Sequence, residues 1–304
     1  MNCGLIIPTL NAGEQFQELL AQISRQTLPT KKLIVDSEST DRTVEVAKNF
    51  GFEVLTVSRA EFNHGATRQF AAEYLSKKFP LDVVIFLTQD ILFHDENSLA
   101  LLVKIFSVSP KIGLAYGRQL PHENATNEAE ILRAFNYPAG NQIRTFESRK
   151  IFGIKAAMAS NSFAAYRVEI LRKVGGFPSV ILCEDMYVAA KMLVAGFETA
   201  YVADAQVYHS HNYTAAQEFR RYFDIGTFHA REGWIREKFG SAEGAGKKFF
   251  VMKISVLWKK NPVECFSAIF RDAMKFFGYR LGRLEKFLPK IFCRAVSTDK
   301  NFWR

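Results

Sequence analysis

The stretch Leu5-Ile6-Ile7-Pro8-Thr9-Leu10-Asn11-Ala12-Gly13 begins as an apolar run and ends as a polar loop with a glycine. A helical pattern follows it to about residue 26, and short apolar runs and helical patterns then alternate as far as residue 117. Such alternation is typical of βαβ units, in which helices cover both faces of a parallel sheet. The sequence therefore predicts an α/β fold with a mostly parallel, Rossmann-like central sheet. The further runs cover 32–35, 53–57 and 83–87, and the further helices begin near Asp41 and Gly65.

Polar residues follow three of these runs, where strands are expected to end. Ligands of such sheets bind beyond the carboxyl ends of the strands, so the three loops are expected to form one site. Asp36 would meet a base or ribose there, and Asp90 a metal ion. The glycine patterns of dinucleotide dehydrogenases and P-loop proteins do not occur, so another kind of nucleotide site is indicated. The loops are Thr9-Leu10-Asn11-Ala12-Gly13, Asp36-Ser37-Glu38-Ser39-Thr40-Asp41 and Thr88-Gln89-Asp90.

The second half of the chain is less regular. The segment from about Leu120 to Ile154 is polar and contains prolines, so we expect a long functional loop or an insertion near the site, on its acceptor side. Beyond it, the pattern predicts a helix that opens near Glu184 and strands at 199–202 and 206–209.

Composition limits the compartment and the number of domains. With 304 residues the chain can form one large α/β domain, or a smaller one with an appendage. Its four cysteines are scattered without Cys-x-x-Cys spacing, which favours a reducing cytoplasm over a disulfide framework. The first apolar run reads as a strand and not as a signal peptide, and no later run approaches the length of about 18 apolar residues that a membrane span needs. A soluble or peripheral protein is predicted.

The net charge of +9 is concentrated at the end of the chain. Residues 247–304 hold 14 Lys and Arg against 4 Asp and Glu, whereas the first 246 residues hold 26 against 27. From Pro262 onward, apolar residues recur every three or four positions, which is typical of an amphipathic helix. A basic, Phe-rich helix of this kind favours an anionic membrane surface. The alternative is packing on its own domain or, in a homo-oligomer, on a second copy of the chain. The apolar residues are Val263, Phe266, Phe270, Ala273, Phe277, Leu281, Leu284 and Leu288, and the cations between them are Arg271, Lys275, Arg280, Arg283, Lys286 and Lys290.

A set of short motifs, taken in their order and spacing, carries a family resemblance. Over roughly residues 4–230 the chain resembles family 2 of the inverting glycosyltransferases, and within it the rhamnosyltransferase-like branch. This resemblance implies a GT-A-type nucleotide-diphospho-sugar transferase fold over 1–240, with a donor half of about 1–118 and an acceptor half of about 119–240, followed by a helical tail, 247–304. The motifs are Ile7-Pro8-Thr9-Leu10-Asn11-Ala12-Gly13, Val35-Asp36-Ser37-Glu38-Ser39-Thr40-Asp41, His64-Gly65-Ala66-Thr67-Arg68, Thr88-Gln89-Asp90, Gly117-Arg118-Gln119, Asn136-Tyr137-Pro138, Ser160-Asn161-Ser162-Phe163, Gly175-Gly176-Phe177-Pro178, Glu184-Asp185 and His209-Ser210-His211-Asn212-Tyr213.

The resemblance also implies the reaction. The donor would be dTDP-L-rhamnose, and the acceptor a glycan or lipid-linked glycan of a cell-surface polysaccharide, at the inner face of the bacterial cytoplasmic membrane. Asp185 would be the general base, and Glu184 would orient the acceptor or cap the helix. Without a catalytic role, both carboxylates would be residues favoured by the helix N-terminal dipole.

The metal site departs from the family pattern, since Gln89-Asp90-Ile91 supplies one carboxylate where many relatives have two. His209 and His211 are two residues apart, so in an extended segment they share a face and either can join Asp90 as a ligand. Oxygen ligands suit Mg²⁺ or Mn²⁺, and an imidazole favours Mn²⁺. The alternative is a cap or turn role for Asp90 and a loop hydrogen bond for each histidine.

The remaining expected donor contacts come from the loops and from two arginines. Asp36 would accept a hydrogen bond from the pyrimidine ring, supported by Thr9. Arg68, at a helix opening that favours anions, and Arg118 would contact the diphosphate or the base. The donor-binding set is Thr9, Asn11, Asp36, Arg68, Gln89, Asp90 and Arg118.

Other functions stay open at this stage. A nucleotidyltransferase would need a Gly-rich, basic loop after the first strand, which Leu10-Asn11-Ala12-Gly13 does not provide. A nucleic-acid-binding or non-catalytic nucleotide-sugar-binding protein would account for the basic tail but not for Glu184-Asp185. A transferase with a UDP-sugar donor is the nearest alternative.

Overall fold

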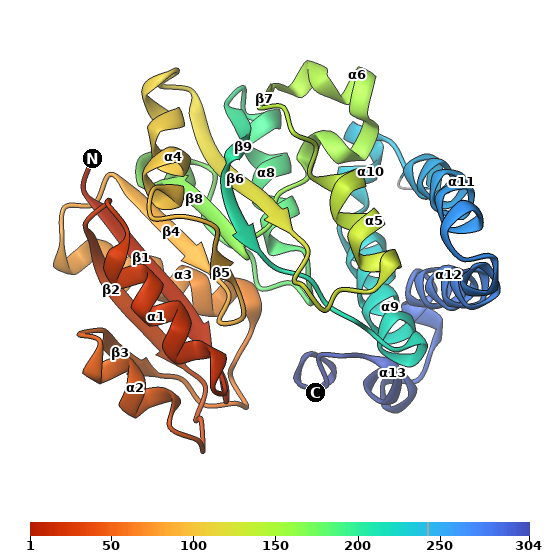
Figure 1. Ribbon diagram of the computed structural model, residues 1–304, viewed down its shortest axis with the longest axis horizontal. Helices are drawn as coiled ribbons and strands as arrows, with labels where there is room; N and C mark the ends of the chain where they lie inside the picture. The colour runs from red at the N-terminus through yellow and green to blue at the C-terminus, as the bar shows by residue number, and fades with distance from the viewer. Residues whose placement is uncertain (242) are drawn as a thin grey trace.

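A computed structural model describes residues 1–241 and 243–304. The strands in these residues form a single sheet (Figure 1). They are β1 (Cys3–Thr9), β2 (Thr30–Asp36), β3 (Glu53–Thr56), β4 (Val83–Leu87), β5 (Leu92–Phe93), β6 (Ile112–Leu120), β7 (Gln142–Arg144), β8 (Phe163–Arg167) and β9 (Glu198–Tyr208). Their order is β3-β2-β1-β4-β8-β6-β9-β5, and β7 pairs with β9.

Helices cover both faces of the sheet. Side chains of α1, α2 and α4 fill the core on one face, and those of α3, α7 and α8 fill the core on the other. The helices are α1 (Gln15–Arg25), α2 (Thr43–Asn49), α3 (His64–Lys78), α4 (Ser98–Lys104), α5 (Asn127–Asn136), α6 (Arg149–Phe152), α7 (Val168–Lys173), α8 (Glu184–Val194), α9 (Ala215–Arg231), α10 (Gly233–Phe239), α11 (Glu243–Lys260), α12 (Pro262–Gly282) and α13 (Lys290–Val296).

The first half of the sheet matches the βαβ prediction. β2 pairs in parallel with β1 and β3, and β4 pairs in parallel with β1. Asn63 sets the start of α3, because its Oδ1 accepts hydrogen bonds from the backbone N–H groups of Gly65 and Ala66. The predicted α/β class is confirmed.

The second half is mixed. β8 runs antiparallel between β4 and β6, while β6 and β9 are parallel. The two strands expected at 199–202 and 206–209 are one strand, β9. Its register against β6 shifts where Gly117 pairs with Val202 and Arg118 pairs with Gln206, so an irregularity interrupts the pattern without ending the strand.

The segment from 120 to 154 was expected to be a long loop or an insertion, and the loop alternative is wrong. It contains α5, β7 and α6. α5 begins at a cap in which Thr126 Oγ1 accepts from Ala129 N, and it buries only Ala129 and Ile131. Two of its acidic residues, Glu128 and Glu130, pair with cations near the end of the chain.

The end of the chain packs on α9 through glycines of α12. A Cβ on Gly278 would lie 2.4 Å from Phe219 O, and one on Gly282 would lie 2.0 Å from Phe223 O. The two helices therefore meet backbone to backbone at these positions, and the tail is joined closely to the rest of the chain. The division into a domain at 1–240 and a tail at 247–304 stays a prediction.

Six buried or half-buried charged residues join α5, α9, α11 and α12, and we call them the six-charge network. Lys253 Nζ lies 2.7 Å from both Glu128 Oε1 and Asp272 Oδ2. Arg271 Nε lies 2.9 Å from Glu128 Oε2 and 3.1 Å from Glu218 Oε2. Lys275 Nζ completes the set at 3.1 Å from Glu218 Oε1 and 3.4 Å from Asp272 Oδ1. Arg271 and Lys275, expected to face a membrane, thus make internal ion pairs.

None of the helices in 1–241 and 243–304 combines the length and the apolar character that a membrane crossing requires.

Candidate active site

Three possible metal ligands lie together where β4 and β9 end. Asp90 follows β4, while His209 and His211 follow β9. Asp90 Oδ1 lies 3.4 Å from His209 Nε2, and Asp90 Oδ2 lies 3.7 Å from His211 Nε2. The ligand atoms are all within 4.8 Å of one another. The structure thus brings together the carboxylate and the two histidines that the sequence suggested.

The chemistry of this cluster fits a divalent cation. Asp90 Oδ1 is buried and has no hydrogen-bond partner. Burial lowers the pKa of His209, and it lowers the pKa of His211 to about 4, so both imidazoles are neutral at pH 7 and have a free lone pair. A carboxylate and two imidazoles form a donor set that divalent transition metals accept.

Gln119, at the end of β6, supports His209 from behind. Its Oε1 lies 2.9 Å from His209 Nδ1, and Arg133 Nη1 of α5 donates to the same oxygen at 2.6 Å. No role was predicted for either residue. Gln119 was noted only within a motif, and Arg133 lies in the segment expected to be a loop, so no pattern in the sequence points to it.

The two adjacent carboxylates at the start of α8 have different surroundings. Glu184 is 5% exposed, and its Oε1 lies 3.0 Å from Arg68 Nη1 and 2.8 Å from Asn161 Nδ2. Asp185 is half-buried, and its carboxylate accepts only from the backbone N–H groups of Asn161, at 3.2 Å, and Met186, at 2.7 Å. As expected for consecutive helical residues, the two side chains do not form a close pair.

These surroundings shift the two pKa values apart. Burial and the nearby negative charge of Glu184 raise the pKa of Asp185 to about 7. Burial also disfavours the charge on Glu184, but the Arg68 guanidinium outweighs it and holds the pKa of Glu184 below its usual range. Asp185 can therefore change its protonation state near neutral pH, as a general base must.

The metal-ligand cluster and the carboxylates are joined through Ser160 and Asn161. Gln119 Nε2 donates to Ser160 Oγ at 2.8 Å, and the next residue, Asn161, contacts both carboxylates. Tyr166 donates to Asn161 Oδ1 at 2.6 Å, so the Asn161 side chain is held on both sides. The general base candidate and the metal-ligand cluster therefore belong to one connected site.

The donor loops converge as expected, and Asp36 lies where two of them meet. Its carboxylate is 1% exposed and accepts from Thr9 Oγ1 at 2.9 Å, Ser39 N at 2.8 Å and Ser39 Oγ at 2.6 Å. A carboxylate has about four acceptor positions, so one is left, and the predicted hydrogen bond from a pyrimidine ring stays a prediction. Asp36 and Thr9 hold two loops together.

Two further side chains join the loops to one another. Asn11 Oδ1 accepts from Thr40 N at 2.8 Å. Gln89 bonds both backbone groups of Leu10, at 2.8 Å and 3.1 Å. The residues expected to contact the donor thus build the rim, and any contact they make with a nucleotide stays a prediction.

The two arginines have different surroundings. Arg68 is 4% exposed and paired with Glu184, and its predicted contact with a diphosphate stays a prediction. Arg118 lies in β6, and its Nε is buried without a hydrogen-bond partner, so a donor contact through Arg118 stays a prediction.

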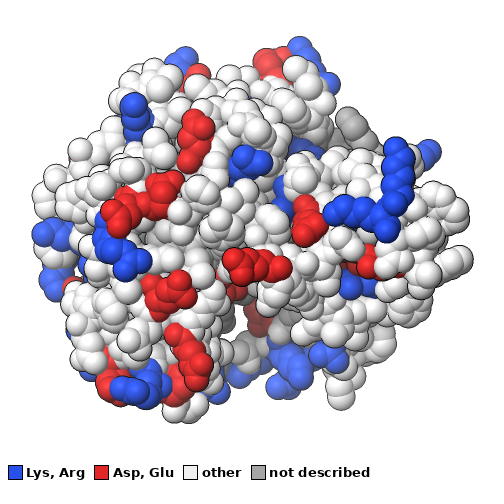
Figure 2. All heavy atoms as spheres, in the orientation of Figure 1, with Lys and Arg blue, Asp and Glu red and all other residues white. Residues whose placement is uncertain are grey.

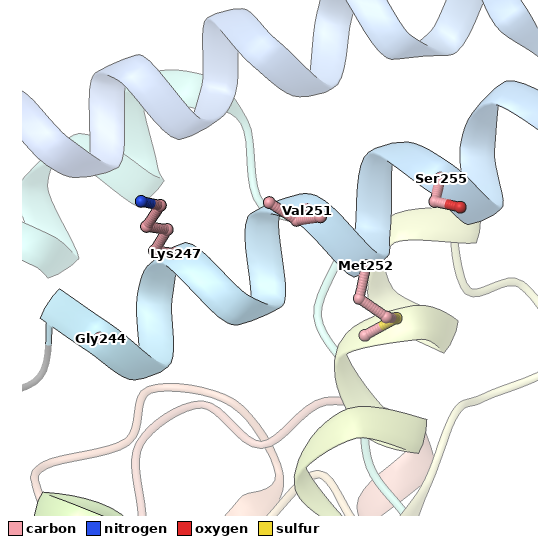
Figure 3. A pocket seen from close by; sticks show the side chains of 5 residues that line it. All are labelled: Gly244, Lys247, Val251, Met252 and Ser255. Carbon is pink, nitrogen blue, oxygen red and sulfur yellow. The ribbon is translucent and has the colours of Figure 1, made fainter.

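Two cavities lie outside the metal-ligand cluster and the carboxylates at the start of α8. A space of about 600 Å³ lies against α11 and is lined by Gly244, Lys247, Val251, Met252 and Ser255, with Met252 pointing toward α5 (Figure 3). A second space of about 290 Å³ lies between the starts of α1 and α2, beside the donor loops. Neither cavity includes Asp90 or Asp185.

Solved structures with the same fold are known. The chain superposes on the mannosyltransferase PcManGT from Pyrobaculum calidifontis, solved with GDP-Man and Mn²⁺, with a TM-score of 0.64 and 16% identity over 94% of this chain and 87% of that one. It superposes on S. aureus TarS 1-349, solved with UDP-GlcNAc, with a TM-score of 0.56 and 14% identity over 94% of this chain and 92% of that one. At such identities the likeness shows the fold alone.

Sequence similarity extends over the whole chain. It is 42% identical to the O-antigen chain rhamnosyltransferase RfbN of Salmonella typhimurium, over 100% of this chain and 96% of that protein. It is also 42% identical to the O-antigen chain rhamnosyltransferase WbaN of Salmonella anatum, over 98% of this chain and 95% of that protein. Residues 5–175 match Glycosyl transferase family 2. The chain belongs to this family and is a glycosyltransferase.

Proposed function

We propose that this chain transfers L-rhamnose from dTDP-L-rhamnose, with inversion, to a glycan or lipid-linked glycan in the synthesis of an O-antigen-type polysaccharide. The observation that carries the proposal is the 42% identity, over nearly the full length, to two proteins named O-antigen chain rhamnosyltransferases. The unequal carboxylates next to the metal-ligand cluster support it, because the reaction needs a base that titrates near neutral pH.

Asp185 is the base in this proposal. As the acceptor hydroxyl oxygen forms a bond with the anomeric carbon, Asp185 takes its proton, and the bond from the anomeric carbon to the diphosphate oxygen breaks. The electron pair of that bond leaves with dTDP. Glu184 does not touch the reacting atoms, since it is held by Arg68 and Asn161. It contributes the charge that keeps Asp185 basic.

Asp90, His209 and His211 hold the divalent cation in this proposal. A bound cation would supply charge stabilisation to the departing diphosphate. The two imidazoles favour Mn²⁺ over Mg²⁺, and a neighbour in fold was solved with Mn²⁺.

A donor panel tests the proposed reaction. Purified protein, Mn²⁺ and membrane lipid extract are incubated with dTDP-L-rhamnose, UDP-glucose or UDP-N-acetylglucosamine, and products are read by mass spectrometry. We expect transfer with dTDP-L-rhamnose. Transfer from a UDP-sugar in preference would refute the donor, and binding of a nucleotide sugar without transfer would refute the catalytic role.

We further propose that α12 and its neighbours dock on the anionic inner leaflet of the cytoplasmic membrane, where a lipid-linked acceptor would lie. Phe266, Phe270 and Phe277 are 74%, 60% and 61% exposed, on the side of α12 opposite the glycines that pack on α9. Burying a Phe side chain contributes about 1.5–3 kcal/mol, so a few inserted rings suffice for weak binding.

The charge of the last helices also favours an anionic membrane as the partner. All four acidic residues after 246 are partly covered and have polar partners, as in the pair between Glu285 and Arg231. The exposed charged side chains that the structure describes from 247 onward are therefore all cationic. Figure 2 shows the face over α12 as largely white, with blue side chains over the adjoining α11. The exposed cations include Lys259, Lys260, Arg280, Lys286, Lys290 and Arg294.

Vesicle flotation tests the docking. The chain is mixed with phosphatidylglycerol-containing or neutral vesicles, beside a variant with Phe266→Ser, Phe270→Ser and Phe277→Ser and a control with Val108→Ser, another exposed apolar residue. We expect the wild type and the control to float with anionic vesicles, less at high salt, and the triple variant to remain below. Equal flotation of all three, or a wild-type dimer that the triple variant abolishes, would refute the membrane proposal.

A further inference from the structure

The imidazole of His209 lies between two oxygen atoms. On one side its Nδ1 lies 2.9 Å from Gln119 Oε1, and on the other its Nε2 lies 3.4 Å from Asp90 Oδ1. His209 is 5% exposed, so these groups and not water determine which ring nitrogen carries the proton.

Arg133 decides between the two positions. A guanidinium can only donate hydrogen bonds, so the Gln119 atom at 2.6 Å from Arg133 Nη1 must be the carbonyl oxygen. The amide nitrogen of Gln119 is then the group that donates to Ser160 Oγ at 2.8 Å. A carbonyl oxygen can only accept, and therefore His209 Nδ1 must be the donor.

The consequence appears on the far side of the ring. With the proton on Nδ1, a neutral His209 presents the Nε2 lone pair to a carboxylate oxygen that has no hydrogen-bond partner. Two acceptors that face each other repel, and a cation between them removes the repulsion. Metal-binding histidines are commonly oriented by such an acceptor on the second nitrogen.

We propose that Gln119 and Arg133 are positioning residues that hold His209 in the Nδ1–H tautomer, so that Nε2 and Asp90 form a ready pair of ligands for a divalent cation. This inference rests on the proposed metal-dependent transfer, which gives the ligand pair its use. The measurements that test it need neither donor nor acceptor.

The position of Arg133 is itself fixed from outside the site. Arg133 belongs to α5, and Glu128 of the same helix is held by Lys253 and Arg271 of the six-charge network. The last helices of the chain thus fix the helix that sets the His209 tautomer.

The tautomer is measured directly by long-range ¹H–¹⁵N NMR on metal-free protein labelled with ¹⁵N-histidine, with the His209 signals assigned from a His209→Gln variant. In wild type we expect Nδ1 to be protonated and Nε2 to be unprotonated. Gln119→Leu should lose this preference. Gln119→Glu should keep it, because a carboxylate also accepts from both Arg133 and His209.

Metal affinity is the second measurement, made by titrating Mn²⁺ without donor or acceptor. Gln119→Leu should raise the dissociation constant about 10- to 100-fold. Arg133→Met should raise it less, and Arg133→Lys should restore part of the loss. The control is Glu130→Gln, on the same helix but paired with Lys260. Unchanged signals of His229, a buried histidine whose Nδ1 lies 3.0 Å from Tyr279 Oη, show that a variant is folded.

Two results would overturn the inference. One is a wild-type His209 with a proton on Nε2 or on both nitrogens. The other is a Gln119→Leu variant with the wild-type tautomer and Mn²⁺ affinity. Failure of the donor panel leaves both measurements intact, so the proposed function and this inference fail separately.

Discussion

Two clusters of charged residues that are shielded from water differ in their balance of positive and negative charge. The six-charge network contains three cations and three carboxylates, and each contact joins opposite charges. The cluster at the start of α8 contains two carboxylates, Glu184 and Asp185, and the guanidinium of Arg68 is paired with Glu184. The charge of Arg221 also acts on Asp185, but no ion pair joins the two among the described residues.

The pKa shifts of the carboxyl groups follow this balance of charge. In the network, burial disfavours the carboxylate, but Lys253 and the other cations outweigh it and lower the pKa of Glu128. At α8, Glu184 has the cation, and the pKa of Asp185 is raised instead. The balanced charges thus keep the Glu128 carboxyl charged, whereas Asp185, which has no ion-paired cation among the described residues, is ready to exchange a proton.

The sharpest test of this contrast is the change of one carboxylate to its amide in each cluster. Asp185→Asn should lower turnover by about 10²- to 10⁴-fold, because the variant has no base for the acceptor hydroxyl. Binding of dTDP-L-rhamnose, measured by calorimetry, should stay nearly unchanged. Asp272→Asn in the network is the matched control and should keep turnover per folded molecule. A wild-type rate in Asp185→Asn would remove this residue from the mechanism.

Breaking the charge balance of the network should cost stability. Lys253→Met takes the cation from Glu128 and Asp272 and leaves two carboxylates without their nearest partner. The free energy of unfolding in urea should fall by about 3–5 kcal/mol. The exposed Lys173→Met, which breaks a surface pair with Glu169, should change it by less than about 1 kcal/mol. Similar small losses in both variants would show that the network is solvated.

The protonation of Asp185 should govern the pH dependence of the reaction. Since the base must be ionised and its pKa is about 7, kcat/KM should rise tenfold per pH unit below that value and level off above it. Glu184→Gln removes the neighbouring negative charge and should move the midpoint to lower pH. A wild-type midpoint near the ordinary Asp pKa of 3.8 would contradict the assignment.

The raised pKa of Asp185 also predicts a cost in stability. Between the ordinary pKa of 3.8 and about 7, the folded chain holds a proton that the unfolded chain has lost, so stability falls as pH rises through this window. Asp185→Asn lacks the buried charge and should be more stable than wild type by about 1–2 kcal/mol at about pH 8, with little difference at about pH 4. The free energies of unfolding of both proteins are measured in urea at both pH values. A variant that is less stable than wild type at the higher pH would be evidence against the raised pKa of Asp185.

The two clusters also show which features could be predicted from the sequence. β1 to β4 are local patterns of apolar runs and caps, and the position of Asp90 after β4 follows from them. The proximity of His209 and His211 to Asp90 could be predicted from the rule that ligands of such sheets bind beyond the ends of the strands. Glu184 and Asp185 were placed at a helix start by pattern, but their unequal surroundings depend on Arg68 and Asn161.

Residues with distant partners could not be predicted in this way. Glu128 and Lys253 are 125 positions apart, and nothing near either one indicates the pair. α5 was taken for a loop for that reason, and Arg271 and Lys275 were taken for membrane-facing cations. Asp36 was expected at the base because it follows a strand, and the sequence did not indicate that Ser39, three positions on, also bonds its carboxylate.

The close approach of α12 to α9 has a consequence for the evolution of the chain. Any side chain at Gly278 or Gly282 would place a Cβ within 2.4 Å of a backbone oxygen of α9, which neither helix can avoid without moving apart. The exposed phenylalanines on the opposite side touch no such backbone and can be exchanged for other apolar residues. Among descendants of this sequence, the two small positions should thus vary least, while the large rings drift freely within their chemical class.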